Sequence, residues 1–247
     1  MKYRSLAIAF SLVLGACNST GPTQLRDVAV SFTATTPTAT AALFDGAEST
    51  AANALVLTSV EIVLREIELE RSDVTDCDLL GENDDGCETF EAGPVLVSVP
   101  VDGSVSQEFS IGIPAGSYNE IEFDIHKVSS GDEADAQFLV QNPAFEDLSI
   151  RVVGTFDGQD FVFETDLNVE QELSLFPPLV IGESTVSTNI TIAVGLDSWF
   201  LDANGQPVNP ATGNKGGVNE NLIEENIENS IEAFEDKNRD GNNDSGS

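Results

Sequence analysis

The chain has 247 residues, a formal net charge of -33 and 40% hydrophobic residues, with 14 Phe among them. A surface this acidic repels nucleic-acid phosphates and anionic lipid headgroups, and it attracts divalent cations. Nucleic-acid binding is therefore excluded as a main function. The hydrophobic content distinguishes the chain from disordered acidic proteins and is sufficient for one core of about 180 residues. We expect one folded domain with short appendages.

The N-terminus has the pattern of an export signal. Lys2 and Arg4 precede an apolar run over residues 6–14, followed by small residues. The apolar run is too short to span a bilayer, so it is typical of a cleaved signal rather than of a transmembrane helix. We therefore predict that residues 1–16 are a signal peptide and are removed.

The string LGAC at residues 14–17 resembles the lipobox of bacterial lipoproteins. This resemblance implies that Cys17 carries the lipid and that residues 17–26 tether the protein to a membrane. Asn18, by the sorting rule of enterobacterial lipoproteins, implies the outer membrane. The alternative is an ordinary signal peptide in which Cys17 is a spare thiol.

Cys77 and Cys87 enclose the acidic segment DLLGENDDG. In an exported protein, two cysteines this close favour a disulfide that closes the loop and stabilises the fold by about 2 to 3 kcal/mol. The alternative is a two-cysteine metal site, but no further cysteine or suitable histidine is present to complete it.

Apolar residues alternate with polar ones in several runs between residues 27 and 213, which is the pattern of strands with one buried face. The runs are short, are separated by turn residues and are not interleaved with helical patterns. We therefore predict an all-β fold, an antiparallel β-sandwich, over 27–213. The predicted strands lie within VAVSF (28–32), LVLTSVEIVLREIELER (55–71), VLVSVPV (95–101), EFSIGIP (108–114), YNEIEFDIHKV (118–128), LSIRVVGTFDGQDFVFETDL (148–167) and TVSTNITIAVGL (185–196).

Two of these runs allow sharper predictions. In the run over 55–71 the apolar phase slips by one residue, which predicts a bulge or bend near Arg65. In the run over 118–128, we expect Ile121, Phe123 and Ile125 to form the buried face.

Asp157-Gly158 lies between two alternating arms and predicts a hairpin with a two-residue turn. In that register Val152 lies opposite Phe163, and Gly154 lies opposite Phe161.

The C-terminal part has the only helical pattern that we identify. Within residues 214–235, a glycine-containing hinge precedes NENLIEENIENSIEAFE, where Ile223, Ile227, Ile231 and Phe234 are spaced four, four and three residues apart. This spacing predicts one amphipathic helix over 219–235, packed against the sandwich.

Residues 236–247 form an Asp-rich tail that resembles part of an EF-hand loop. Counted from Asp236, oxygen-bearing side chains occupy the first, third, fifth and ninth places, and a glycine occupies the sixth. The twelfth place is Ser247 instead of a bidentate Glu, so we expect only weak calcium binding, with Kd of roughly 0.1 to 1 mM. The alternative is a solvated acidic tail. The predicted ligands are Asp236, Asn238, Asp240, Asn242 and Asp244.

The single histidine, His126, shares a predicted strand face with Glu122 and Asp124. These three residues would suit a metal or acid/base cluster, and the alternative is a solvent-facing strand surface. With one histidine, triads of the Ser-His-Asp or Cys-His kind have little support. We therefore do not expect an enzyme.

Three segments in this order, IPAGSYNEIEFDI, GLDSWFLDANGQPVNP and NIENSIEAFEDKNRDGNND, resemble a family of uncharacterised bacterial lipoproteins. That family has a β-rich domain of unknown function and an Asp-rich C-terminal loop similar to the partial calcium loops of dockerins. The resemblance covers residues 110–247. It implies a surface or periplasmic lipoprotein and no established activity.

Taken together, these features predict a lipid-anchored β-sandwich of the cell envelope with a non-enzymatic binding or structural role and a C-terminus steadied by weak calcium. Its expected partners are the membrane, through the anchor, and a glycan or an envelope protein. One alternative is a carbohydrate-active enzyme or carbohydrate-binding accessory module, although Trp199 and two Tyr provide few aromatic platforms. The other is an adhesion or assembly partner.

Overall fold

The computed structural model describes residues 25–36, 55–72, 93–185 and 187–244. The predicted signal peptide, the lipidation site Cys17 and the pair Cys77 and Cys87 lie outside the described residues. Within the described residues the chain is mostly strand, and none of its helices has the length and apolar character needed to cross a bilayer.

The strands of the described residues form two sheets. Sheet A has the order β10-β9-β1-β4, and its pairs β1–β4 and β9–β10 are antiparallel. The pair β1–β9, in contrast, is parallel. The prediction of a purely antiparallel fold is therefore wrong for this sheet, because two strands far apart in sequence run side by side in the same direction. The strands of sheet A are β1 (Arg26–Thr35), β4 (Ser106–Ile113), β9 (Ser187–Gly195) and β10 (Ile231–Glu235).

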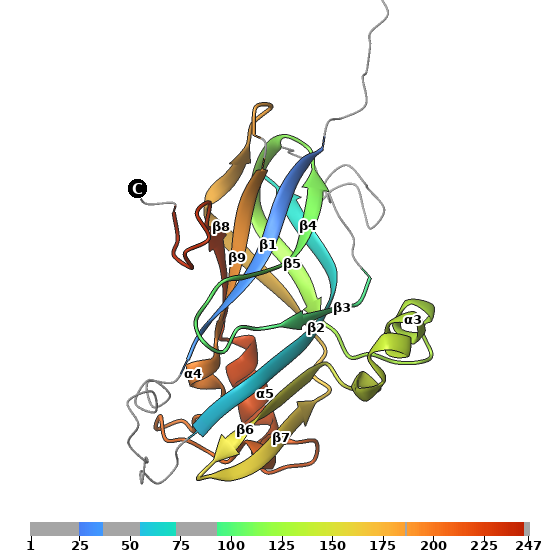
Figure 1. Ribbon diagram of the computed structural model, residues 1–247, viewed down its shortest axis with the longest axis vertical. Coiled ribbons are helices and arrows are strands. Elements are labelled where there is room, and N and C mark those ends of the chain that lie inside the picture. The colour runs from blue at the N-terminus through green and yellow to red at the C-terminus, as the bar shows by residue number, and fades with distance from the viewer. Residues whose placement is uncertain (1–24, 37–54, 73–92, 186, 245–247) are drawn as a thin grey trace, which may run out of the picture.

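Sheet B is built around β2, which has 17 residues and runs through much of the length of the molecule (Figure 1). Its order is β7-β6-β2-β5-β8, and β3 also pairs with β2. All of these pairs are antiparallel. The strands of sheet B are β2 (Leu55–Arg71), β3 (Val95–Ser98), β5 (Gly116–Ile125), β6 (Ile150–Phe156), β7 (Gln159–Thr165) and β8 (Val169–Ile181).

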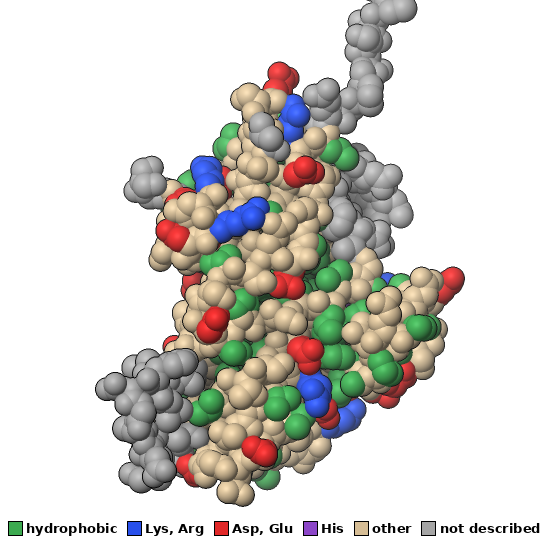
Figure 2. All heavy atoms as spheres, in the orientation of Figure 1, with side chains coloured by type: hydrophobic (Ala, Val, Ile, Leu, Met, Phe, Trp, Pro, Cys, Tyr) green, Lys and Arg blue, Asp and Glu red, His purple; other side chains and the backbone are tan. Residues whose placement is uncertain are grey.

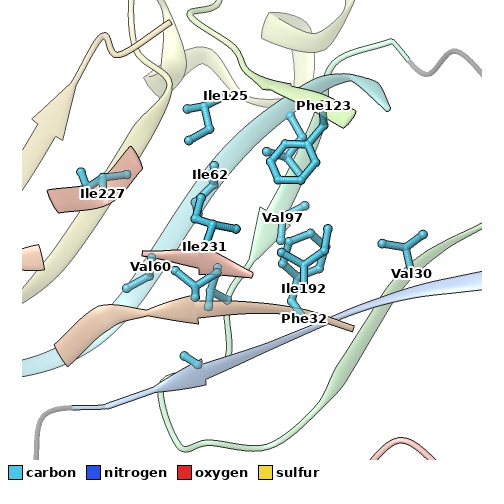
Figure 3. Packing of buried hydrophobic residues seen from close by; sticks show 14 of the residues in the cluster. Val30, Phe32, Val60, Ile62, Val97, Phe123, Ile125, Ile192, Ile227 and Ile231 are labelled. Carbon is cyan, nitrogen blue, oxygen red and sulfur yellow. The ribbon is translucent and has the colours of Figure 1, made fainter. Parts of the chain in front are cut away.

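Side chains from both sheets form one hydrophobic cluster. Figure 3 shows Phe32 of β1 and Ile192 of β9 close to Val97 of β3 and Phe123 of β5. The predicted buried face of β5 is confirmed, since Ile121, Phe123 and Ile125 are all in this core. The alternation of residues along each strand thus places the apolar faces of the two sheets in contact with each other.

The predicted hairpin and bulge are both confirmed. β6 and β7 pair with Val152 opposite Phe163 and Gly154 opposite Phe161. The pairing of β2 with β5 shifts register between Arg65 and Glu68, where Glu66 has a left-handed φ of 52°. Both features depend on residues close together in sequence.

The prediction of a helix over 219–235 is wrong in its second half. Helix α5 (Glu220–Glu228) buries Ile223 and Ile227 as expected, but the chain then turns and Ile231–Glu235 forms β10. Trp199 Nε1 donates a hydrogen bond of 2.7 Å to Ser230 Oγ at this turn. Ile231 and Ala233 also fit the period of two of a strand. Pairing with the open edge of β9 satisfies backbone groups of β9 that a helix in this position would leave unpaired.

A nine-residue helix, α3 (Glu133–Gln141), is present in addition to the predicted one. It begins at Asp132, whose side chain accepts hydrogen bonds from the Ala134 and Asp135 amides. In Figure 1, α3 protrudes from the side of the molecule, between β5 and β6 in sequence. The remaining short helical segments are η2 (Pro143–Phe145), α4 (Leu196–Trp199) and η3 (Pro210–Gly213).

Candidate functional site

On β1 and β9, part of the second face of sheet A is polar and yet buried. On β9, Asn189 and Thr191 point away from the hydrophobic core and are 1% and 0% exposed. Ser31 of β1 is likewise 0% exposed. Polar groups without water need hydrogen-bond partners in the protein. The Asp-rich loop that follows β10 supplies some of them.

A chain of hydrogen bonds connects the two strands to the loop. Ser31 Oγ donates to Asn189 Oδ1 over 2.6 Å, and Asn189 Nδ2 donates to Thr191 Oγ1 over 3.0 Å. Thr191 Oγ1 in turn donates to Asp236 Oδ2 over 2.9 Å. Asp236 is 0% exposed and its amide donates to the carbonyl of Asn189. The first residue of the Asp-rich loop is therefore part of the folded body.

The same Asp236 carboxylate organises the loop. It accepts hydrogen bonds from the amides of Asp240 and Gly241 over 3.1 and 3.0 Å. Gly241 has φ of +80°, a value that L side chains rarely adopt, and a Cβ there would lie 3.2 Å from Val105 Cγ2. The loop thus requires glycine at the sixth place for two reasons: the positive φ and the limited space beside Val105.

The remaining predicted ligands lie at the surface of the loop. Asp240 Oδ1 accepts hydrogen bonds from the side chain and the amide of Asn242, which hold the pKa of Asp240 below its ordinary value. Asp244 Oδ2 accepts a hydrogen bond of 2.7 Å from the Lys237 amide. Asn238 Nδ2 donates to Asp240 Oδ2. All five predicted residues therefore belong to one ordered loop.

The loop provides carboxylate and amide oxygens, the hard donors that calcium prefers, so its donor set fits this ion. It differs from an EF-hand in what precedes it, because a strand rather than a helix leads into Asp236. The alternative of a solvated acidic tail does not describe Asp236, which is fully buried. That burial has no clear signal in the sequence, because it depends on where β10 pairs.

A second acidic cluster lies on sheet B. Glu70 of β2 and Glu120 and Glu122 of β5 have carboxylate oxygens within 4.8 Å of one another. Partial burial is the largest of the effects that raise the pKa of Glu122 to about 7, followed by a hydrogen bond with Glu120 and the negative charges of Glu120, Glu70 and Glu170. Glu120 lies two residues from Glu122 on the same face of β5, whereas Glu70 joins them only through the pairing of β2 with β5.

His126 does not complete a cluster with Glu122 and Asp124. Its Nε2 lies 2.9 Å from both carboxylate oxygens of Asp135 on α3. Asp135 is 0% exposed and also accepts a hydrogen bond of 2.8 Å from the Ser129 amide, while Arg65 Nη1 lies 4.0 Å away. These contacts attach α3 to the end of β5, and they are typical of a structural link.

A third group brings Asp166, Glu220 and Glu224 within 4.8 Å. Asp166 Oδ2 already accepts hydrogen bonds from Lys215 Nζ and Lys127 Nζ, over 2.6 and 2.9 Å, and these ammonium groups lower the pKa of Asp166. The two lysines pair with Asp166 and offset part of the negative charge of this group, so it forms an ion-pair network between α5 and the segment after β7.

Aromatic side chains give little support to a carbohydrate site in the part of the chain that the structure describes. Trp199 and Tyr118 are both 0% exposed. Tyr118 donates its hydroxyl to the carbonyl of Pro114 over 2.9 Å, and Trp199 packs edge-to-face on Phe200. Both side chains are part of the hydrophobic core.

Comparison with known proteins does not assign a family. The chain matches no family model, no curated protein and no solved structure. The functional argument therefore depends on the residues and their geometry.

Proposed function

We propose that this protein is a lipid-anchored, non-enzymatic β-sandwich of the bacterial cell envelope, at the outer membrane, and that calcium steadies its C-terminal loop. The anchor rests on the export signal and Cys17. The observation that carries the calcium part is that buried Asp236 bonds both to β9 and to the loop amides, and so holds the oxygen-bearing side chains of Asp240 and Asp244 in one ordered loop. Its role is a structural clamp that supports a binding or structural surface.

The clamp depends on the hydrogen bonds that connect the Asp-rich loop to sheet A. Asp236 links Thr191 in sheet A to the amides of Asp240 and Gly241, so the loop conformation and the packing of β10 depend on each other. A cation held by the exposed oxygens of Asp240 and Asp244 would offset the repulsion among the loop carboxylates. Weak affinity suits the millimolar calcium outside cells.

Calcium titration of the full-length protein tests the clamp. At about 10 mM calcium and a Kd of roughly 0.1 to 1 mM, linkage raises the free energy of unfolding by roughly 1.4 to 2.7 kcal/mol. Asp240→Asn keeps a hydrogen-bond acceptor but removes a charged ligand, so the gain should largely vanish. The matched control is Asp202→Asn, because Asp202 is also exposed and accepts amide hydrogen bonds from Asn204 and Gln206.

Isothermal titration calorimetry measures the binding heat, and thermal unfolding measures the stabilisation. Binding heat and stabilisation that survive in the control but not in Asp240→Asn support the clamp. Equal heats from the wild type and both variants would show that calcium binds elsewhere, and no heat at all would leave the loop as a purely hydrogen-bonded structure.

The anchor has its own test. Cells grown with an alkynyl fatty acid should label the wild-type protein, and Cys17→Ala should abolish the label. Cys77→Ala is the control, since it removes a cysteine outside the lipobox. A label that persists in Cys17→Ala contradicts the anchor.

A further inference from the structure

β8 and β10 are end strands of the two sheets, and they lie beside each other (Figure 1). In the part of the chain that the structure describes, β8 pairs only with β5, and β10 pairs only with β9. The other edge of each strand therefore presents backbone N–H and C=O groups with which an added strand can pair.

A hollow lies between these two edges. It is lined by residues 172–174 and Phe176 of β8, by residues 231–233 of β10 and by Asn243 of the Asp-rich loop. Successive residues of a strand point to opposite faces, so a hollow that reaches three consecutive residues of both strands runs along their edges rather than over one face. A ligand in this hollow can therefore contact the backbone of β8 as well as side chains.

The hollow is acidic and contains an exposed aromatic ring. Glu172 and Glu232 are exposed, and neither carboxylate accepts a hydrogen bond or forms an ion pair with another described residue. Lys237 and Arg239 of the Asp-rich loop are not among the lining residues. Phe176 is 85% exposed. Two carboxylates beside an aromatic ring suit a Lys or Arg side chain, which pairs with the acids and is attracted to the face of the ring.

The edge of β8 is open over residues 169–176, because the two prolines that follow have no N–H to donate. Glu170 and Glu172 lie on the exposed face of this stretch, whereas Leu173 and Leu175 pack against the hydrophobic core. A strand added here would continue an acidic face on one side and an apolar face on the other. It should therefore alternate basic and apolar residues.

We infer that the open edge of β8 binds an extended segment of a partner protein in which basic and apolar residues alternate. A Lys or Arg side chain of that segment lies in the hollow, between Glu172 and Glu232 and against Phe176. The segment adds a strand to sheet B, so backbone hydrogen bonds hold it and charge selects it. This inference depends neither on the lipid anchor nor on calcium.

A basic partner fits this edge better than a second copy of the chain does. Each copy carries a net charge of -33, and Figure 2 shows acidic side chains from one end of the molecule to the other. Glu172 also lies opposite Glu122 of β5, so acidic groups extend from the edge across sheet B. This charge repels a second copy and attracts a basic segment.

Fluorescence anisotropy with a labelled peptide tests the inference on the full-length protein, in about 100 mM sodium chloride to screen long-range attraction. The probe is the peptide Lys-Val-Lys-Val-Lys-Val-Lys. The control peptide has the same composition with all its lysines ahead of its valines, so it has the same charge but no alternation. The alternating peptide should bind severalfold more tightly, and hydrogen exchange should slow in residues 169–176 when it binds.

Substitutions locate the site. Glu172→Gln combined with Glu232→Gln should raise the Kd of the alternating peptide roughly five- to thirtyfold, as expected for the loss of two solvated ion pairs. The matched control combines Glu133→Gln and Glu225→Gln, two exposed positions on α3 and α5, and should leave the Kd nearly unchanged. Phe176→Ala should weaken binding severalfold, because it removes the aromatic face.

Three outcomes would overturn the inference. Equal affinity for the two peptides, or equal weakening in the two double variants, would mean that net charge alone attracts the probe. Slower hydrogen exchange elsewhere but not in residues 169–176 would place the peptide on another surface. A dimer that forms without peptide and is lost in Phe176→Ala would mean that a second copy covers the edge.

Discussion

Glu122 lies between Glu68 of β2 and Glu172 of β8 in the register of sheet B. Like charges directly opposite each other destabilise a sheet, and partial burial adds to the cost of ionising this carboxyl. Its pKa of about 7 in the folded protein lies above the ordinary value of 4.5. The fold therefore favours the protonated form of Glu122 over a pH range where the unfolded chain is ionised.

This shift gives a pH dependence with a definite sign. Between the unfolded pKa of 4.5 and the folded pKa of about 7, the folded state binds more protons, so its stability is highest below this window and decreases as pH rises through it. Glu122→Gln should increase the free energy of unfolding at pH 7.5, on the order of 1 kcal/mol because solvent screens this partly exposed group.

Thermal unfolding at pH 5 and pH 7.5 measures the effect. The decrease in the free energy of unfolding from pH 5 to pH 7.5 should be smaller in Glu122→Gln than in the wild type. Glu225→Gln, an exposed position on α5, should leave that change as it is. Identical pH profiles for wild type and Glu122→Gln would argue against the shifted pKa.

At the scale of single elements, the segment after α5 shows how one pattern serves two structures. Ile223, Ile227 and Ile231 are spaced as on one helix face, but only the first two lie on α5. β10 begins at Ile231 because β9 presents an edge with which it can pair. Sequence periodicity does not contain that information, since β9 lies more than thirty residues upstream.

Matched substitutions distinguish the two structures. Thr has lower helix propensity and higher strand propensity than Glu. Glu225→Thr in α5 should lower the free energy of unfolding by about 0.5 kcal/mol, whereas Glu232→Thr in β10 should leave it equal or raise it slightly. Urea unfolding measures both. An equal decrease in the free energy of unfolding at the two positions would indicate that the helix extends through residue 232.

Helix α3 is held by a buried link. Asp135 is 0% exposed and His126 Nε2 contacts both of its carboxylate oxygens. His126→Leu should lower the free energy of unfolding by about 3 kcal/mol, because it leaves a buried carboxylate with fewer partners. Adding Asp135→Leu should restore much of the loss, since the double variant has no unpaired buried charge. Urea unfolding of both variants measures these free energies. A double variant that is less stable than His126→Leu would contradict this interpretation.

At the scale of the whole molecule, a net charge of -33 opposes the compact state. Salt should therefore stabilise the protein, because the Debye length falls from about 30 Å at 10 mM to about 10 Å at 100 mM ionic strength. We expect the unfolding temperature to rise over this range, as measured by calorimetry in sodium chloride. A variant with Gln at positions 120, 122 and 172 should respond less. A midpoint that does not change with salt would mean that long-range repulsion contributes little.

The sequence alone determined the features that depend on neighbouring residues. The buried face of β5, the bulge near Arg65 and the Asp157-Gly158 hairpin all follow from alternation and turn chemistry within a few positions. The loop residues from Asp236 to Asp244 were likewise recognisable from their spacing.

Only the tertiary structure decided which distant segments meet. The parallel pairing of β1 with β9, the strand β10 and the burial of Asp236 depend on contacts between segments far apart in the chain. The pKa of Glu122 has the same origin, since its acidic neighbours lie on three strands. Local propensity sets how a segment can fold, but the open edges and buried polar groups of its neighbours determine which of those structures is stable.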